Sequence, residues 1–229
     1  MTLETAERWF YKTLHYRFQD LGLFGQALTH RSAARVNNER LEFLGDAILD
    51  FVISEAVYAL RPDASEGDLS KLRSSLVKDS SLAALAADLG IGEHLILGGG
   101  ELKSGGHRRE SILADALEAL FAAVFLDSGI EPAKRVIQQV FAARLEALPD
   151  AADLRDPKTR LQEWLQGRGL ELPEYELLEV TGEAHKQRFE VTCRVADSDA
   201  VTSGRSTTRR NAEQKAAKAM LTVLRGDTA

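Results

Sequence analysis

The chain has 229 residues, of which 44% are hydrophobic and 28% charged, and its formal net charge is −6. This length allows one large or two small domains, and no apolar run approaches the ~20 residues of a membrane span. Cys193 is the only cysteine and cannot form an internal disulfide, so a reducing, cytoplasmic setting is predicted. The net negative charge comes from residues 1–152, because residues 153–229 carry 13 basic and 13 acidic side chains and are neutral overall.

Apolar periodicity predicts helices over residues 3–18 and 23–32, with Phe18 among the core contacts of the first. His30 lies near the end of the second helix and is a candidate catalytic base. A single histidine beside apolar residues is, however, more often a packed or capping side chain.

The next predicted helix carries an acidic face and begins with NERLEFLGDAIL at residues 38–49. At ~100° per residue, four carboxylates project within about 80° of one another, namely Glu39, Glu42, Asp46 and Asp50. The opposite face is apolar and contains Leu41, Leu44, Ile48, Phe51 and Val52. Such a row of carboxylates is either a solvated surface or a site that holds a cation.

Arg61-Pro62 predicts the end of this helix, and Ser65 is the expected N-cap of the next one, with Asp68 completing a capping box. A further helix over residues 80–89 should stop at Gly90. The segment 98–109 is rich in glycine and has the sequence GGGELKSGGHRR. It contains three basic residues, Lys103, Arg108 and Arg109. Composition does not separate a flexible loop from a segment that contacts phosphate.

The helix over residues 111–126 is apolar on every side except at Asp115 and Glu118, which predicts a buried helix. Buried carboxylates persist when they are protonated, paired with cations or bound to metal, and this helix contains no basic residue. Since Mg²⁺ prefers oxygen ligands, the pair is interpreted as half of a Mg²⁺ site and the acidic stripe at 39–46 as the other half. The alternative is a capping or salt-bridge role for each carboxylate.

Glu131-Pro132 predicts a helix to about Leu148 with proline at its first position, and residues 148–157 then break the periodicity. The remaining chain has the order α-β-β-β-α, with helices over 158–167 and 208–224 and strands over 175–181, 187–196 and 201–205. Alternation in the second strand places Cys193 in a sheet core, so it is interpreted as structural. The last helix should pack through Ala212, Ala216, Ala219, Met220 and Val223. Basic residues at its start suit phosphate, or are simply solvated.

Several of these segments resemble the bacterial ribonuclease III family, and the resemblance covers essentially the whole chain. They are NERLEFLGD (38–46), ESILADALEAL (110–120), DPKTRLQEWLQ (156–166), the GEAH turn (182–185) and RRNAEQKAA (209–217). The resemblance implies a multidomain fold with an all-α endonuclease domain at residues 1–148 that forms a homodimer. A linker at 149–156 and a small α+β double-stranded-RNA-binding domain at 157–226 would follow.

The resemblance also implies a Mg²⁺-dependent endoribonuclease that hydrolyses phosphodiester bonds in double-stranded RNA. It would leave 5′-phosphate and 3′-hydroxyl ends with short 3′ overhangs, and would process ribosomal RNA precursors and some mRNA and tRNA transcripts. One or two Mg²⁺ ions per site, with Mn²⁺ as a substitute, would be held by Glu42, Asp46, Asp115 and Glu118. Asp46 and Glu118 would be catalytic, and Glu39 and Glu66 would support the site or contact substrate. Asp50, one turn beyond Asp46, is interpreted as a solvated or ion-paired carboxylate.

The implied RNA contacts lie in the second domain. Those to the minor grooves are Thr159, Gln162, Glu163, Gln166 and His185, and those to phosphates are Arg209, Arg210 and Gln214, with Lys218 a weaker candidate. A non-cleaving double-stranded-RNA-binding regulator is the alternative function. It is disfavoured because a protein that only binds RNA gains nothing from carboxylates on a buried helix face.

Overall fold

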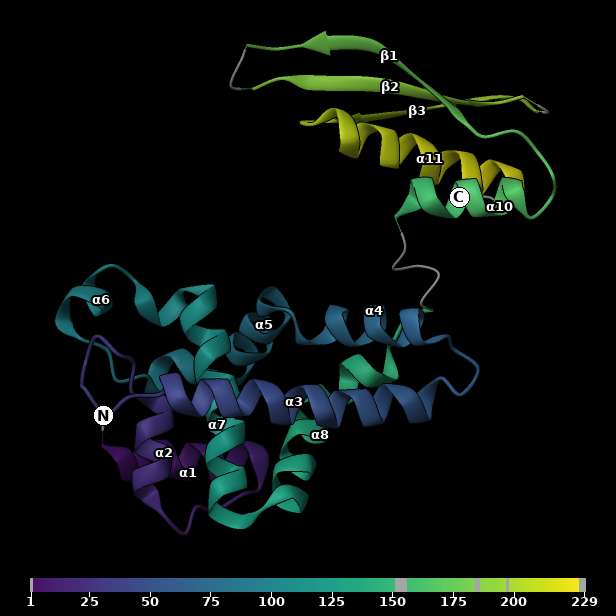
Figure 1. Cartoon of the computed structure of the whole chain (residues 1–229). Coiled ribbons are helices and arrows are strands. Elements are labelled where there is room, and N and C mark those ends of the chain that lie inside the picture. The colour runs from purple at the N-terminus through teal and green to yellow at the C-terminus, as the bar shows by residue number, and fades with distance from the viewer. Residues whose placement is uncertain (1, 151–155, 184–185, 197, 227–229) are drawn as a thin grey trace. The chain divides into compact units, whose positions relative to one another are not determined.

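The computed structural model describes residues 2–150, 156–183, 186–196 and 198–226 (Figure 1). The chain divides into two compact units, Met1–Ala151 and Ala152–Ala229. The first is helical and the second contains an antiparallel sheet with two helices, so the predicted fold class is confirmed. None of the helices in the described ranges is both long enough and apolar enough to cross a bilayer.

The first unit is a bundle of α-helices with two short 3₁₀ turns. In chain order these are α1 (Leu3–Leu14), α2 (Leu21–Leu28), α3 (Glu39–Leu60), α4 (Glu66–Val77), α5 (Asp79–Leu89), η1 (Ile91–His94), α6 (Gly99–Lys103), η2 (Gly106–Arg108), α7 (Glu110–Ser128) and α8 (Ile130–Glu146). Helix α7 is the buried helix that the sequence predicts, since its residues Ile112 to Val124 are buried except at Asp115 and Glu118. It packs against α2, α3, α5 and α8, and α3 is its most extensive neighbour.

Local signals set most helix boundaries of this unit as predicted. Helix α3 ends before Pro62, and the Ser65 side chain accepts the backbone N–H of Asp68 at 3.2 Å as the N-cap of α4. Gly90 ends α5 in a left-handed conformation with φ +78°, which glycine adopts without a steric penalty.

Other boundaries differ from the prediction. Helix α1 ends at Leu14 because His15 adopts a left-handed conformation with φ 54°, so Phe18 reaches the core from a loop and packs on Phe10 at 5.3 Å between ring centroids. Helix α8 begins at Ile130, which places Pro132 third rather than first. The segment 98–109 is not an extended flexible loop, because it contains α6 and η2.

The second unit contains α10 (Pro157–Gln166), β1 (Glu174–Thr181), β2 (Arg188–Val195), β3 (Ser198–Ser206) and α11 (Arg209–Arg225). Its strands are antiparallel in the order β1-β2-β3, and both helices lie on one face of the sheet (Figure 1). The core between helices and sheet contains Leu161, Leu165, Cys193, Val195, Ala216, Ala217, Met220 and Leu221. Cys193 is therefore buried, as predicted, whereas Val223 is 52% exposed and does not belong to the packed face of α11.

Candidate metal centre

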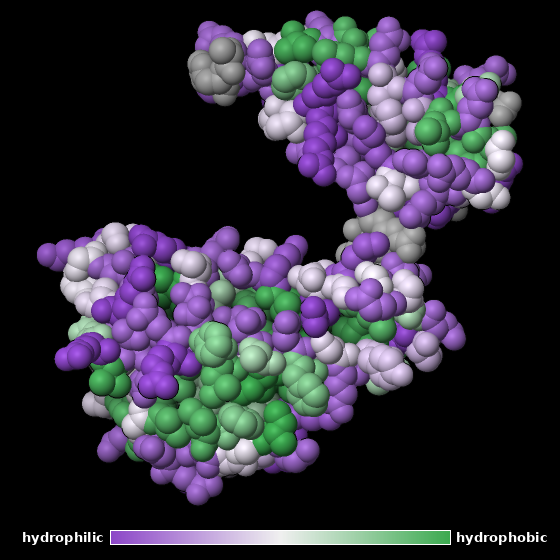
Figure 2. Space-filling model, viewed as in Figure 1, coloured by the Kyte–Doolittle hydropathy of each residue, from purple (hydrophilic) through white to green (hydrophobic). Residues whose placement is uncertain are grey.

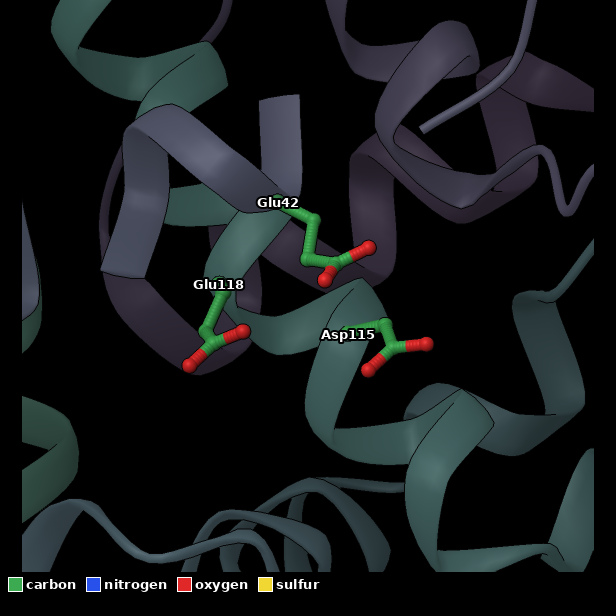
Figure 3. Close-up of side chains that lie close together, drawn as sticks. All are labelled: Glu42, Asp115 and Glu118. Carbon is green, nitrogen blue, oxygen red and sulfur yellow. The ribbon is translucent and has the colours of Figure 1, made fainter. Parts of the chain in front are cut away.

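Three carboxylates from two helices meet in the first unit. Glu42 comes from α3, and Asp115 and Glu118 come from α7, where their spacing of three residues puts them on one face (Figure 3). Each offers one oxygen atom, and these three oxygens lie within 4.8 Å of one another. The structure thus brings together three of the four predicted metal ligands.

A glycine lets the two helices approach closely at this point. Gly45 of α3 is buried, and a Cβ atom built on it would lie only 1.9 Å from the carbonyl oxygen of Glu118. The backbones of α3 and α7 are therefore in direct contact one turn from Glu42. No side chain larger than hydrogen fits at residue 45 without separating the helices.

The carboxylates of the site are held in an environment that opposes their ionisation. Burial, followed by the charges of Asp46, Asp115, Glu42 and Asp79, raises the pKa of Glu118 to about 8. Burial also raises the pKa of Asp115 and of Glu42, in each case with further contributions from neighbouring carboxylates. A cation placed between these groups would remove the repulsion and return them to their ionised form.

The donor set fits a hard divalent ion such as Mg²⁺. Carboxylate oxygens are the protein ligands that Mg²⁺ prefers, and it takes its remaining ligands from water or phosphate. Across the described ranges, no salt bridge joins Glu42, Asp115 or Glu118 to a basic side chain. This observation argues against the alternative in which salt bridges account for the carboxylates.

The other members of the acidic stripe have different surroundings. Asp46 is exposed and close enough to raise the pKa of Glu118, but it is not in the group whose oxygens lie within 4.8 Å. Glu39 faces Arg31 at 3.5 Å, and the Oδ1 atom of Asp50 lies 3.8 Å from the Nε atom of Arg73. The assignment of Asp46 as a metal ligand thus stays a prediction.

Glu66 lies outside the carboxylate cluster. It is the first residue of α4, and its Oε1 atom accepts a hydrogen bond from the Ser70 hydroxyl at 3.0 Å. It lines a separate pocket of about 330 Å³ together with Phe51, Tyr58 and Arg73. Its role in substrate contact stays a prediction.

A polar cleft of about 570 Å³ opens beside the carboxylates. Its lining residues are His30, Arg31, Ser32, Asn38, Glu39, Glu42, Glu101, Arg109, Ser111, Ile112 and Asp115. Arg109 pairs with Glu101 at 2.7 Å, which ties α6 to the start of α7 and gives part of the segment 98–109 a structural role.

Sequence reasoning did not identify Arg31 or Asp79 as neighbours of the site. Arg31 lowers the pKa of Glu42 and of Asp115, and Asp79, the first residue of α5, raises the pKa of Asp115 and of Glu118. Neither residue belongs to a periodic pattern that faces the cluster. Only the packing of α5 and of the turn after α2 around α7 brings them there.

All of the predicted RNA contacts of the second unit except His185 lie on two helices, α10 and α11. The four on α10, listed as Thr159, Gln162, Glu163 and Gln166, are all exposed. Arg209 and Arg210 are exposed at the start of α11, where Arg209 pairs with Glu213 at 3.0 Å. The Gln214 amide donates to Asp156 at 2.5 Å, so it is engaged within the protein. His185 lies outside the described residues.

Comparison with protein families assigns both units. Residues 20–145 match the family described as Ribonuclease-III-like, and residues 157–224 match the double-stranded RNA binding motif.

Curated relatives and solved structures agree with these matches. A protein named Ribonuclease 3 from Dechloromonas aromatica is 54% identical over 93% of this chain and 96% of its own length. A second Ribonuclease 3, from Alkalilimnicola ehrlichii, is 53% identical over 91% of each chain. The crystal structure of the nuclease domain of ribonuclease III from Campylobacter jejuni is 41% identical, with a TM-score of 0.57, and covers 59% of this chain and 94% of its own. Another structure of that domain, described for flexibility in a region involved in dimer formation, is 43% identical, with a TM-score of 0.56, over 60% of this chain and 93% of its own.

Proposed function

Because the chain belongs to the ribonuclease III family of double-stranded-RNA endoribonucleases, we propose that it cleaves RNA duplexes with Mg²⁺ held by Glu42, Asp46, Asp115 and Glu118. The observation that carries this proposal is the cluster of Glu42, Asp115 and Glu118, whose oxygens lie within 4.8 Å of one another. A duplex-binding protein without nuclease activity would have no use for three half-buried carboxylates that repel one another.

The carboxylates of α3 and α7 would orient the metal at the edge of the polar cleft. When bound, Mg²⁺ supplies an acidified water molecule and positive charge at the scissile phosphate. Asp46 and Glu118 are the proposed catalytic ligands, and Glu39 supports the site through its pair with Arg31. Displacement of the 3′ oxygen leaves a 5′ phosphate and a 3′ hydroxyl. One or two ions per site, with Mn²⁺ as a substitute, fit this donor set.

The second unit would bind the duplex by its shape. Side chains do not reach the bases through the deep major groove of A-form RNA, so recognition relies on 2′-hydroxyls and phosphates. The exposed polar face of α10 suits a minor groove. Arg209 and Arg210 stand at the start of α11, where free N–H groups and the positive end of the helix dipole favour phosphate. His185 remains a predicted minor-groove contact, and Gln214 would have to exchange Asp156 for a phosphate.

An apolar surface on the first unit supports a homodimer. Figure 2 shows apolar side chains gathered on one face of this unit, over α3 and the neighbouring α7 and α8. On α3, Phe43, Phe51 and Tyr58 are 81%, 59% and 71% exposed, and their spacing puts them within about 80° of one another. Exposed apolar surface of this kind marks an interaction site. Phe51 is thus exposed, although it lies on the apolar face of α3 that also carries the buried residues Leu41, Ile48 and Val52.

A symmetric dimer would carry two equivalent sites, and each would cut one strand of the duplex. Staggered cuts of this kind produce the short 3′ overhangs that the resemblance implies. Precursors of ribosomal RNA and some mRNA and tRNA transcripts, processed in the cytoplasm, are the proposed substrates.

Incubation of the purified protein with a perfect RNA duplex tests the nuclease proposal. We expect cleavage in Mg²⁺, binding without cleavage in Ca²⁺, and no cleavage in EDTA, with products that carry 5′ phosphates. Binding without any Mg²⁺-dependent cleavage would favour the alternative function, a non-cleaving regulator.

A further inference from the structure

A histidine that the proposed metal site does not use lies in the same cleft as the carboxylates. His30 follows α2 by two residues and lines the cleft together with Glu42 and Asp115. Its side chain is partly buried and close enough to Asp115 to lower the pKa of that carboxyl. The backbone N–H of His30 donates to the carbonyl of Ile96 at 3.0 Å, which anchors the residue to the segment before α6.

Hydrogen bonds from Ser32 fix the orientation of the imidazole ring. The backbone N–H of Ser32 donates to Nδ1 of His30 at 3.2 Å, and the Ser32 Oγ atom lies 2.8 Å from the same nitrogen. This Oγ accepts the N–H of Gly98 at 3.0 Å, so its own proton is free to donate to Nδ1. A nitrogen that accepts hydrogen bonds carries no proton, and the ring proton is therefore assigned to Nε2.

The N–H group at Nε2 is a fixed donor in a cleft that is rich in acceptors. Within the described part of the chain, Nε2 of His30 has no hydrogen-bond partner. The two guanidinium groups of the cleft are both engaged, Arg31 with Glu39 at 3.5 Å and Arg109 with Glu101 at 2.7 Å. The Nδ2 atom of Asn38, which also lines this cleft, is a second donor without a partner in the described part of the chain. His30 Nε2 is thus a ring donor whose orientation is fixed and which lies in the same cleft as Glu42 and Asp115.

We propose that His30 is a further RNA-contacting residue of the nuclease site, whose Nε2–H donates to a non-bridging oxygen of the scissile phosphate. The inference rests on the proposed function, since it needs RNA in the cleft. Phosphate oxygens are strong acceptors, and a preorganised donor stabilises the charge that develops on them in the transition state.

The alternative is a purely structural role, in which His30 only caps the turn after α2 through Nδ1. Two substitutions separate the roles. In His30→Asn, the side-chain oxygen can replace Nδ1 as acceptor of the Ser32 N–H, because asparagine commonly accepts from the N–H two residues later, but no donor reaches the position of Nε2. In His30→Gln, the amide nitrogen reaches that position and can donate, whereas the acceptor for the turn is displaced.

The test uses full-length protein and an RNA duplex, at a temperature at which circular dichroism shows every variant folded. Single-turnover cleavage in Mg²⁺ measures the chemical step, and duplex affinity in Ca²⁺ measures binding. We expect His30→Asn to slow cleavage roughly 10- to 100-fold, the effect of losing one hydrogen bond to a charged group, while duplex affinity changes less than about threefold. His30→Gln should retain more of the cleavage rate than His30→Asn.

The opposite order would overturn the inference. If His30→Asn cleaves as fast as His30→Gln or faster, the ring acts only through Nδ1 and the turn. If the wild-type protein cleaves no duplex in Mg²⁺, the proposed function itself fails, and the two failures are thereby distinguished.

Discussion

The Cα atom of Gly45 faces the carbonyl group of Glu118, so the backbone of α3 touches the backbone of α7 at the metal site. This contact sets the distance between Glu42 on one helix and the carboxylates of Asp115 and Glu118 on the other. The glycine in the sequence LEFLGD is thus explained by the proximity of α7.

The first prediction concerns this contact. Gly45→Ala places a Cβ atom 1.9 Å from the Glu118 carbonyl oxygen, so α3 and α7 must separate and the carboxylates move apart. We expect a loss of thermal stability of about 1–3 kcal/mol, typical of overpacking, together with loss of cleavage. Gly67→Ala is the matched control, because a Cβ at this helical glycine of α4 meets nothing within 4 Å. A Gly45→Ala protein as stable and active as Gly67→Ala would contradict the account.

The second prediction follows from the pKa of Glu118, which is raised from 4.5 to about 8. Below pH 4.5 the group is protonated in both the folded and the unfolded chain. As the pH rises from about 4.5 to about 8, the unfolded chain releases this proton first, so the free energy of unfolding falls. In EDTA, Glu118→Gln should remove this loss and become progressively more stable relative to the wild type across that window.

Urea denaturation at several pH values measures this difference. Glu146→Gln, at the exposed end of α8, is the control and should track the wild type at every pH. If the difference in unfolding free energy between Glu118→Gln and the wild type is independent of pH, the pKa of Glu118 is not raised, and the account of Glu118 as a buried carboxyl without a cationic partner is contradicted.

The third prediction tests Asp46, which the structure places beside the cluster rather than within it. Mg²⁺ binds the folded protein, so it should raise the midpoint of thermal unfolding, by an amount equivalent to about 2.7 kcal/mol at 100 times its dissociation constant. Asp46→Asn should reduce this shift and the cleavage rate. Asp50→Asn, one turn further along α3, removes a carboxylate that faces Arg73 and should leave both unchanged. Equal Mg²⁺ shifts in the two variants would exclude Asp46 from the metal site.

The fourth prediction concerns the homodimer. Phe43→Asp puts a charge on the most exposed apolar side chain of α3 and should convert the protein to a monomer, as measured by light scattering after gel filtration. Leu178→Asp, at a 54% exposed position of β1 in the other unit, should leave the mass unchanged. A dimer that persists in Phe43→Asp would place the interface elsewhere.

The sequence predicts some parts of the site better than others, for physical reasons. Asp115 and Glu118 interrupt an otherwise apolar helix, so their burial and shared face follow from periodicity alone. Asp79 and Arg31 reach the cluster only through tertiary packing, which leaves no periodic signal.

An exposed apolar side chain and a helix end show the same limit. The apolar face of α3 contains both buried residues and the exposed Phe51, and hydropathy alone does not distinguish a side chain of the core from one at an interface. The end of α1 was placed too late because His15 adopts a left-handed conformation that residues other than glycine rarely show.

The measurement that tests the central claim most directly is duplex cleavage by Glu118→Gln. The substitution keeps the shape of the side chain and removes its charge, so we expect cleavage in Mg²⁺ to fall by more than about a hundredfold, while duplex affinity in Ca²⁺ stays at the wild-type level. Wild-type cleavage by this variant, or loss of both cleavage and binding in a folded variant, would contradict the assignment of Glu118 to a catalytic metal site.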